Sequence, residues 1–335
     1  MLERIRKAAE IIASRETELA EIAQVIRDGG APASSAEKGL ILPVKRRGLD
    51  ISVCGVDGGL IYERLHGMDL LLSRAVAVNF TYEDSSMKSH SHFPSKFPEH
   101  SLDIGTGLDE HESMLWKSLL RLQAEVSVAI SALEKSDPDI LLMDGSILPL
   151  PSDRPAESSP LFPVYEGVVT LYRKLYAECG KRNCQLVGVI KDTRAKRLVE
   201  SVGCRLGVGD TLLASHLLGE DERTCAMSYS DHSQPVLKDL QDFSYNVKVF
   251  YLRPSKDDLP LRIEFLDCGK SADDVASVLC SLSSVSRTFA YPAVLIEADM
   301  CAAMNPVDME SVKKQLFALS NGTIRPLRRN CRPFR

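Results

Sequence analysis

Two acidic residues each follow a short apolar run and precede a glycine. Asp57 stands in the stretch SVCGVDGGL at residues 52–60, and Asp144 stands in the stretch ILLMDGSIL at residues 140–148. Asp-Gly is a strong turn dipeptide, so both sites can be read as simple turns after a strand. The alternative is a metal site that is built from the ends of two strands.

The second interpretation holds if the two strands lie side by side and run parallel. Asp57 and Asp144 would then meet at one edge of the sheet, and two carboxylates so close repel each other unless a cation lies between them. Oxygen ligands with few histidines select Mg²⁺ or Mn²⁺ rather than zinc. Sites of this kind activate water for the cleavage of phosphodiesters.

The order of the predicted elements supports parallel neighbours. The hydrophobic patterns predict three strands, a long helix, a strand, a helix, a strand and a helix, at residues 51–56, 60–64, 72–80, 108–134, 139–143, 163–179, 185–190 and 195–202. This is the order of the ribonuclease H-like fold, an α/β class with a mixed sheet flanked by helices. Its first and fourth strands are parallel neighbours, which would place both aspartates mid-sheet.

A third carboxylate is expected from the long helix that precedes the fourth strand. That strand rises about 17 Å from Asp139 to Asp144, and a helix needs about 11 residues to cover this height. Counting back from the helix end near residue 135 leads to Glu125 at the margin of the apolar stripe. Glu112 also borders the stripe, but it lies about two turns or more too far along. The other interpretation of Glu125 is a surface residue beside the core face.

The stretch YPAVLIEADM at residues 291–300 is predicted to be a buried strand or an extended segment. Asp299 at its end is a candidate further metal ligand, and Tyr291 is a candidate for positioning a phosphate or a water. Further along the chain, the patterns predict an antiparallel strand pair at residues 247–252 and 261–266 and helices at residues 211–218, 272–282 and 307–319.

Three histidines, His90, His92 and His100, lie in a polar segment at residues 83–106 that is predicted to be irregular. The HSH triplet has the residue types of a metal site, but no carboxylate stands at a fixed helical spacing from it. We therefore expect these histidines not to bind metal.

The composition limits the class of protein. The chain has 335 residues with 44% hydrophobic and 26% charged residues and a net charge of −5, so it is globular and has no overall basic surface, although a local basic channel stays possible. It has no apolar run of the 18 or so residues that a membrane span needs, and its charged N-terminus lacks the apolar core of a signal peptide. We expect a cytoplasmic protein with no membrane partner.

The cysteines fit that expectation. None of the nine forms a CxxC pair, and Cys54 and Cys280 lie inside apolar runs. This pattern predicts reduced core cysteines and disfavours a disulfide framework or a structural zinc site.

Six motifs in order resemble the NurA nuclease family. They are VDGG at 56–59, LLMDGS at 141–146, GVIKDTRAKRL at 188–198, GDTLLASHLL at 209–218, the pair VFYL and LRIEFLD within 249–267, and YPAVLIEADM at 291–300. The resemblance implies a nuclease domain at residues 45–322 with a ribonuclease H-like core at about 50–202. Residues 1–35 would be an N-terminal helical arm and linker, which packs on a partner subunit or on its own domain. Residues 323–335 would be a basic tail, which is a solvated end or a contact to phosphates.

The resemblance also implies an activity. The family's members are Mn²⁺-dependent DNA nucleases that form a homodimer around a channel and work with a HerA-type hexameric translocase on DNA ends for recombination. For this chain we expect a 5′–3′ exonuclease and single-strand endonuclease that processes double-strand breaks with Mn²⁺ or Mg²⁺.

The family's functional residues can be matched to positions in this sequence. Its two strand aspartates match Asp57 and Asp144, its helix glutamate matches Glu125, and its tyrosine matches Tyr291. Some members have a histidine where this chain has Asp299, so the role of this position is open.

Three further residues follow the core strands. Lys191 and Arg194 are candidate phosphate contacts at the mouth of the site, or ordinary loop charges. Asp210 is either the N-cap of the following helix or a lesser acid of the site.

Two other functions are compatible with parts of the sequence. An actin-like ATPase or sugar kinase shares the ribonuclease H-like core, and VDGGL is similar to its first phosphate loop, but a second glycine-rich loop and an adenosine motif are missing. A catalytically silent subunit that docks a translocase would suit the helical arm and the arginine-rich tail, but the retained carboxylates argue against it.

Overall fold

A large mixed sheet forms the centre of the molecule. The computed structural model describes residues 1–29, 32, 35, 37–229, 234–321 and 324–328. Among these residues, eleven strands form one sheet in the order β1-β8-β10-β11-β7-β6-β2-β3-β4, with β5 on β3 and β9 on β10. The strands are β1 (Ile41–Pro43), β2 (Ile51–Leu65), β3 (Met68–Glu83), β4 (Ser86–Phe93), β5 (Ser101–Gly105), β6 (Ile140–Asp144), β7 (Gln185–Ile190), β8 (Glu222–Thr224), β9 (Met227–Ser228), β10 (Val247–Arg253) and β11 (Leu261–Leu266).

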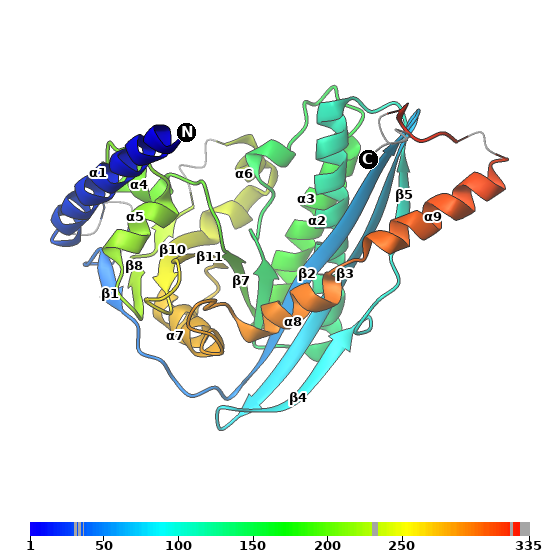
Figure 1. Ribbon diagram of the computed structural model, residues 1–335. Coiled ribbons are helices and arrows are strands. Elements are labelled where there is room, and N and C mark those ends of the chain that lie inside the picture. The colour runs from blue at the N-terminus through cyan, green and yellow to red at the C-terminus, as the bar shows by residue number, and fades with distance from the viewer. Residues whose placement is uncertain (30–31, 33–34, 36, 230–233, 322–323, 329–335) are drawn as a thin grey trace.

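Helices cover both faces of this sheet (Figure 1). The long helices α2 and α3 lie on one face, where α4 and α5 follow farther along, and α7 and α8 lie on the other face. The helices are α1 (Leu2–Arg27), α2 (Glu110–Ser136), α3 (Phe162–Lys181), α4 (Arg197–Ser201), α5 (Asp210–Leu217), α6 (Pro235–Asp239), α7 (Ala272–Leu282), α8 (Ala293–Ala302) and α9 (Pro306–Leu319), with short 3₁₀ turns η1 (Pro151–Asp153) and η2 (Gln241–Asn246). The predicted fold class, a mixed sheet flanked by helices, is confirmed.

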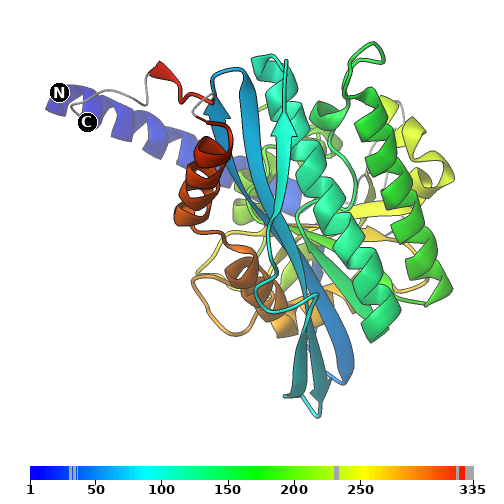
Figure 2. The same cartoon turned by 90° about the vertical axis from the view of Figure 1, so that its right-hand side faces the viewer.

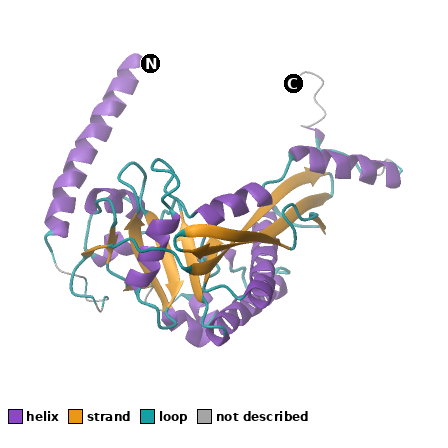
Figure 3. Cartoon of the chain, turned by 90° about the horizontal axis from the view of Figure 1, so that it is seen from below, coloured by secondary structure: helices purple, strands orange, loops and turns teal. Residues whose placement is uncertain are grey.

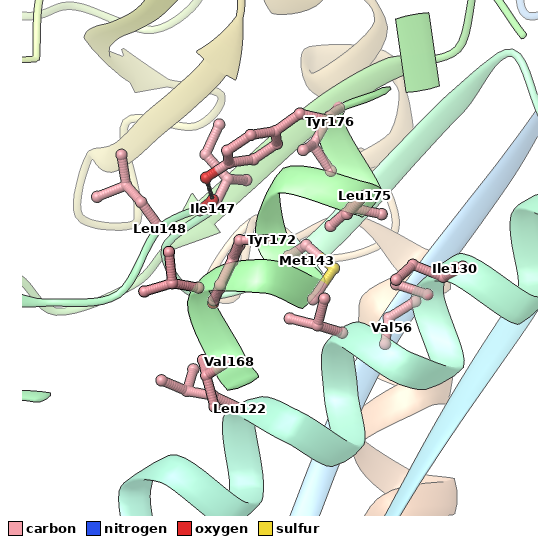
Figure 4. Close-up of a cluster of buried hydrophobic side chains, with 14 of the residues drawn as sticks. Val56, Leu122, Ile130, Met143, Ile147, Leu148, Val168, Tyr172, Leu175 and Tyr176 are labelled. Atoms are coloured by element: carbon pink, nitrogen blue, oxygen red, sulfur yellow. Dashed lines mark hydrogen bonds between the residues drawn. The ribbon is translucent and has the colours of Figure 1, made fainter. Parts of the chain in front are cut away.

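Strand alternation sends side chains to two separate cores. Val56 and Met143 point toward α2 and α3, where they pack with Leu122 and Tyr172 (Figure 4). In the same core, the buried hydroxyl of Tyr176 donates a hydrogen bond of 2.6 Å to the carbonyl of Ile147. The neighbouring residues of β2 and β6 point to the opposite face and pack under α7 and α8. Both faces of the central strands are therefore buried.

The turn interpretation of residues 57–59 is wrong. β2 runs without interruption from Ile51 to Leu65, so the two strands predicted at 51–56 and 60–64 are one. Asp57, Gly58 and Gly59 pair with residues 76, 75 and 74 of β3. The two glycines serve close packing inside a strand, which a sequence pattern cannot separate from a turn.

Two other local predictions are wrong. The polar segment at residues 83–106 is not irregular, because it contains the strands β4 and β5, both of which pair with β3. The stretch at residues 291–300 is not a strand, because residues from Ala293 onward form helix α8. A short, continuous apolar run fits a buried helix as well as a buried strand. Here Ala, Leu, Glu and Met favour the helix.

The N-terminal arm is attached to its own chain by its second half. Leu19 and Ala23 of α1 are buried against α5, and Arg27 pairs with Glu222 at 2.6 Å. The first half of α1 is exposed and projects from the body (Figures 2 and 3). The linker prediction falls partly on residues 30–31, 33–34 and 36, which lie outside the described residues.

The start of the basic tail is attached to the β2–β3 hairpin. Pro326 forms a bridge with Leu65, and the amide of His66 donates to the carbonyl of Arg325 at 2.9 Å. Residues 322–323 and 329–335 lie outside the described part of the chain, and most of the predicted tail falls there. No helix within the described residues is both long enough and apolar enough to cross a membrane.

Candidate metal centre

The register of two parallel strands brings Asp57 and Asp144 together. The last paired residues of β2 and β6 are Val56 and Met143, so the two aspartates occupy the next position on neighbouring strands. One carboxylate oxygen from each of Asp57, Asp144 and Asp299 lies within 4.8 Å of the other two. The structure therefore assembles three carboxylates from β2, β6 and α8, and we name these three residues the aspartate cluster.

Asp144 is held by two neighbours. The hydroxyl of Tyr291, which is 2% exposed, donates to Asp144 Oδ1 at 3.0 Å and lies 3.0 Å from the carbonyl of Val189. Lys191 Nζ donates to Asp144 Oδ2 at 2.9 Å and lies 4.4 Å from the centre of the Tyr291 ring. Lys191 thus faces the aspartate cluster, whereas Arg194 is exposed and lines the adjacent cavity.

Glycines let helix α8 approach the sheet closely enough to present Asp299. A methyl group at Gly59 would lie 2.1 Å from the carbonyl oxygen of Ala302, and one at Gly55 would lie 3.0 Å from that of Val294. Arg74 Nε also donates to the Ala302 carbonyl at 3.1 Å. Any side chain larger than glycine at position 59 would push α8 away from β2.

Glu125 approaches from the opposite face of the sheet. Its side chain lies beside Gly58, where a methyl group would be 2.7 Å from Glu125 Cγ, and the residue is 4% exposed. Arg121, one turn earlier on α2, donates to Glu125 Oε1 at 2.7 Å. Glu125 is not part of the aspartate cluster, but it borders Asp57 and lines the same cavity as Asp144.

Burial and like charges make ionisation of the site costly. Burial, then the neighbouring Asp144 and Glu125, raise the pKa of Asp57 to about 7, although the Gly58 amide opposes this. Burial also raises the pKa of Glu125 to about 7, against the effect of Arg121. The pKa of Tyr291 is raised well above its ordinary value, mainly by burial and then by Asp144. A cation among these carboxylates would favour their ionised forms.

The donor set fits a hard divalent cation. The atoms that converge in the aspartate cluster are all carboxylate oxygens, with the hydroxyl of Tyr291 behind them. Mn²⁺ and Mg²⁺ prefer such ligands, whereas zinc prefers nitrogen and sulfur. The residues present therefore fit the predicted metal.

A cavity of about 860 Å³ opens beside the carboxylates. Glu125 and Asp144 line it, and residues from α2, the β6–η1 loop and the segment after β7 form its walls. Five of its lining side chains are basic, namely Arg121, Arg194, Lys196, Arg197 and Arg262. Six acidic residues, Glu125, Asp144, Asp153, Asp192, Glu200 and Glu264, line the same cavity, so its wall carries charges of both signs.

Sequence reasoning missed a buried polar group in this cavity. Glu264 is 1% exposed, accepts from Ser146 Oγ at 2.6 Å and pairs with Arg262 at 2.9 Å. It fixes the loop that directly follows Asp144. The sequence did carry a sign of this buried pair, because Arg262 and Glu264 are charged residues two positions apart in an otherwise apolar strand. The pair of Arg121 and Glu125 was also predictable, because the two residues are four positions apart on a helix.

Two other acids have separate tasks. Glu112 completes a capping box with Asp109 at the start of α2, with hydrogen bonds of 3.0 and 2.8 Å. Asp210 is fully buried at the start of α5, where it accepts from the Val199 amide at 2.9 Å and from the Tyr251 hydroxyl at 2.5 Å. The N-cap of α5 is Gly209, so the N-cap prediction for Asp210 is wrong.

Comparison with known proteins gives one family and several solved structures. The sequence model of the NurA domain matches residues 51–303. The NurA nuclease from Sulfolobus solfataricus is similar in structure, with a TM-score of 0.63 and 16% identity over 96% of this chain and 95% of that one. A NurA structure bound to dAMP and manganese has a TM-score of 0.55 and 12% identity over 96% of this chain and 97% of that one. A comparison with curated protein sequences found no match.

Proposed function

This chain belongs to the NurA domain family, and from that premise we propose that it is a metal-dependent deoxyribonuclease that uses Mn²⁺ or Mg²⁺. The observation that carries the proposal is the convergence of Asp57, Asp144 and Asp299 within 4.8 Å, next to a cavity whose wall includes Arg194, Lys196 and Arg197. A related NurA structure contains both manganese and dAMP, which is the pairing that such a site would need.

We assign the metal to Asp57 and Asp144, with Asp299 and Glu125 as the two further carboxylates of the site. When bound, the ion supplies Lewis-acid chemistry that activates water and neutralises charge on the phosphate. Tyr291 keeps Asp144 in a single orientation through its hydroxyl. Lys191, 2.9 Å from Asp144, keeps a positive charge beside the reacting phosphate. Arg121 holds Glu125 on the cavity wall.

The cavity is the proposed binding place of the DNA strand end. Arg194 and the neighbouring Lys196 and Arg197 lie on its wall beside β7, where they would contact backbone phosphates. Contacts of this kind position a strand without reading its sequence. Specificity would therefore be for ends and backbone. The overall charge of −5 does not conflict with a DNA substrate, because only the residues that contact phosphate must be basic.

A nuclease assay on end-labelled linear DNA tests this proposal. Wild type would be compared with Asp57→Asn and Asp144→Asn in Mn²⁺, Mg²⁺ and EDTA, with Asp84→Asn as a matched control. Asp84 is exposed in the β3–β4 turn, beyond the end of β3 that pairs with Ile51, whereas Asp57 pairs with Val76 farther along the same strand. Asparagine tolerates its positive φ. We expect cleavage that needs metal and is lost only in the first two variants. Cleavage that survives in both would contradict the assigned site.

The finer activity follows from the family and stays a proposal. We propose 5′–3′ exonuclease and single-strand endonuclease activity on DNA ends during repair of double-strand breaks by recombination, in complex with a HerA-type hexameric translocase. Substrates labelled at the 5′ or the 3′ end, with a circular single strand as the endonuclease substrate, separate these activities. Stimulation by the purified translocase, and its absence with an unrelated hexameric ATPase, would support the partnership.

We also propose a homodimer, with the first half of α1 as part of its surface. Leu2, Ile5 and Ile12 are 73, 58 and 61% exposed, and every residue in this half of the helix is exposed. A second copy would bury these apolar residues. Light scattering on Ile5→Glu/Ile12→Glu should give a smaller mass than wild type, and an unchanged mass would remove α1 from the proposed interface.

The two alternative functions are distinguishable. The ATPase interpretation needs a phosphate loop at VDGGL, but these residues lie in the paired strand β2, and Glu125 and Ala302 fill the space beside the glycines. For a silent docking subunit, the expected result is no Mn²⁺ binding and no cleavage with or without the translocase. Equilibrium dialysis with Mn²⁺ decides between this and an active nuclease.

A further inference from the structure

The HSH triplet forms part of a strand, not of a loop. His90 and His92 are alternate residues of β4, so both point to the same face of the sheet. Their ring centroids are 5.7 Å apart with an interplanar angle of 87°. The side chain of His92 is only 10% exposed, because α8 lies over this face. The sequence pattern shows no carboxylate near these histidines, but α8 can supply one from a distant part of the chain.

Helix α8 supplies a carboxylate and a thiol next to His92. Glu297 and Cys301 are four residues apart, so both lie on one side of the helix. His92 Nε2 lies 3.1 Å from Glu297 Oε1, and Cys301 Sγ lies 3.6 Å from the same oxygen. One ligand atom from each of the three residues lies within 4.8 Å of the other two. Figure 1 shows α8 crossing the sheet near β2 and β3, and β4 pairs with β3 at the edge of the sheet.

We propose that His92, Glu297 and Cys301 form a zinc site, which we name the mixed cluster. Imidazole nitrogen, carboxylate oxygen and thiolate sulfur are all common zinc ligands, and a tetrahedral ion would keep a fourth position for water or another side chain. The sulfur and nitrogen donors disfavour Mn²⁺ and Mg²⁺. The mixed cluster is therefore chemically separate from the aspartate cluster, although both include residues of α8.

Charge at the mixed cluster is compatible with a cation. Lys96 Nζ lies 3.0 Å from Glu297 Oε1, so a positive charge already neutralises this carboxylate. The Lys96 side chain is 53% exposed, and a surface pair of this kind contributes little to stability, so zinc can displace it. Binding would convert the Cys301 thiol to a thiolate and release its proton to solvent, without any redox step.

The position of the mixed cluster suggests its task. β4 is the edge strand of the sheet, and α8 carries Asp299 two residues after Glu297. A zinc ion would join the edge strand to the helix that presents Asp299 to the aspartate cluster. The proposed task of this site is to hold α8 against β4, and it adds to the proposed nuclease function without depending on it.

Metal binding to the full-length protein tests the proposal. Metal-stripped protein would be titrated with Zn²⁺ against a chromophoric chelator, and with Co²⁺ to record the thiolate-to-cobalt absorption band. The variants are Cys301→Ser and His92→Asn, with Cys268→Ser and His100→Asn as controls, because Cys268 is exposed and neither residue belongs to the mixed cluster. The double variant Asp57→Asn/Asp144→Asn separates the two clusters.

We expect one zinc per chain in wild type, in both controls and in the double variant. Zinc affinity should fall by about tenfold or more in Cys301→Ser and His92→Asn, and the thiolate band should vanish in Cys301→Ser. Thermal melting in EDTA checks that the variants fold, and His92→Asn keeps the test valid if loss of the buried Cys301 thiol destabilises the chain. Three results would each overturn the proposed site: no zinc in wild type, wild-type zinc affinity in both Cys301→Ser and His92→Asn, or zinc lost only in the double variant.

Discussion

Helix α8 takes part in two groups of potential metal ligands that differ in chemistry. In the aspartate cluster, Asp299 joins Asp57 and Asp144, so every donor is a carboxylate oxygen. In the mixed cluster, Glu297 and Cys301 join His92, so the donors are oxygen, sulfur and nitrogen. One helix would therefore supply ligands for a hard cation and for a softer one, because residues 297 and 301 share a side of the helix that residue 299 does not.

The two clusters also differ in how their charge is balanced. Glu297 has both Lys96 and His92 beside it, and these neighbours lower the pKa of its carboxyl against the effect of burial. The three aspartates have one ammonium, Lys191, within bonding distance among the described residues, and burial with like charge raises the pKa of Asp57 to about 7. The aspartate cluster thus gains far more from a divalent cation, which points to it as the reactive site and to the mixed cluster as a structural one.

The largest effect is expected from removing charge in the aspartate cluster. Asp57→Asn or Asp144→Asn should lower the rate of DNA cleavage by more than about 100-fold, because even indirect partners of a metal contribute 10- to 100-fold. Cleavage rates at saturating Mn²⁺ measure this, with Asp84→Asn as control. Loss of zinc in the same variants would contradict the separation of the two clusters.

A smaller effect is expected from Tyr291→Phe, which removes the hydrogen bond to Asp144 but keeps the ring under Lys191. Because the hydroxyl orients a ligand, Mn²⁺ affinity and the cleavage rate should both fall by about 10- to 100-fold. Dialysis with Mn²⁺ and single-turnover cleavage measure the two quantities. Tyr82→Phe, at a half-buried tyrosine of β3, is the control. An unchanged Mn²⁺ affinity would exclude a positioning role.

Mn²⁺ binding at the aspartate cluster should depend on pH. The pKa values of Asp57 and Glu125 lie near 7, so both carboxyls hold protons below pH 7 that a metal must displace. Apparent Mn²⁺ affinity should therefore fall as pH is lowered through 7, by up to about tenfold per pH unit for each proton released, and it should level off above pH 8. Titrations at pH 6, 7 and 8 check this. Asp57→Asn should reduce the pH dependence but not remove it, because Glu125 still holds a proton below pH 7. A wild-type affinity independent of pH would contradict the raised pKa values.

The smallest effect on catalysis is expected from Gly58→Ala. The added methyl group would meet the flexible side chain of Glu125, which must shift away from the aspartate cluster. We expect the cleavage rate to fall by about tenfold or less, with zinc binding unaffected. Gly167→Ala is the control, because this helical glycine has open space around it and alanine should stabilise α3 by about 1 kcal/mol. No change in rate for Gly58→Ala would argue that Glu125 is not part of the site.

Part of this arrangement was predictable from local patterns. The helix predicted at 108–134 is α2, and the strands predicted at 139–143 and 185–190 are β6 and β7, within one or two residues. The position of Glu125 followed from the rise per residue of a helix and a strand. The structure places this residue beside Gly58 at the level of Asp57. These inferences depend on short-range periodicity, which the chain carries in its own residues.

Other features were not predictable, because they depend on contacts between distant segments. The cluster of His92 with Glu297 and Cys301 joins residues more than 200 positions apart. The polar residues of β4 form a strand because they pair with β3, and α8 lies close to the sheet because the glycines of β2 let it approach. No spacing along the chain reveals such pairs.

The sequence by itself determined the order of the elements from α2 to β7 and the strand residues Asp57 and Asp144, because side-chain alternation and apolar periodicity are local properties. The tertiary structure decided which other groups meet them. It brings Tyr291, Lys191 and Asp299 to Asp57 and Asp144. It also places Glu297 and Cys301 of α8 beside His92 of β4. The physical reason is that metal ligands must converge within a few ångströms, and only the folded packing of β2, β6 and α8 sets those distances.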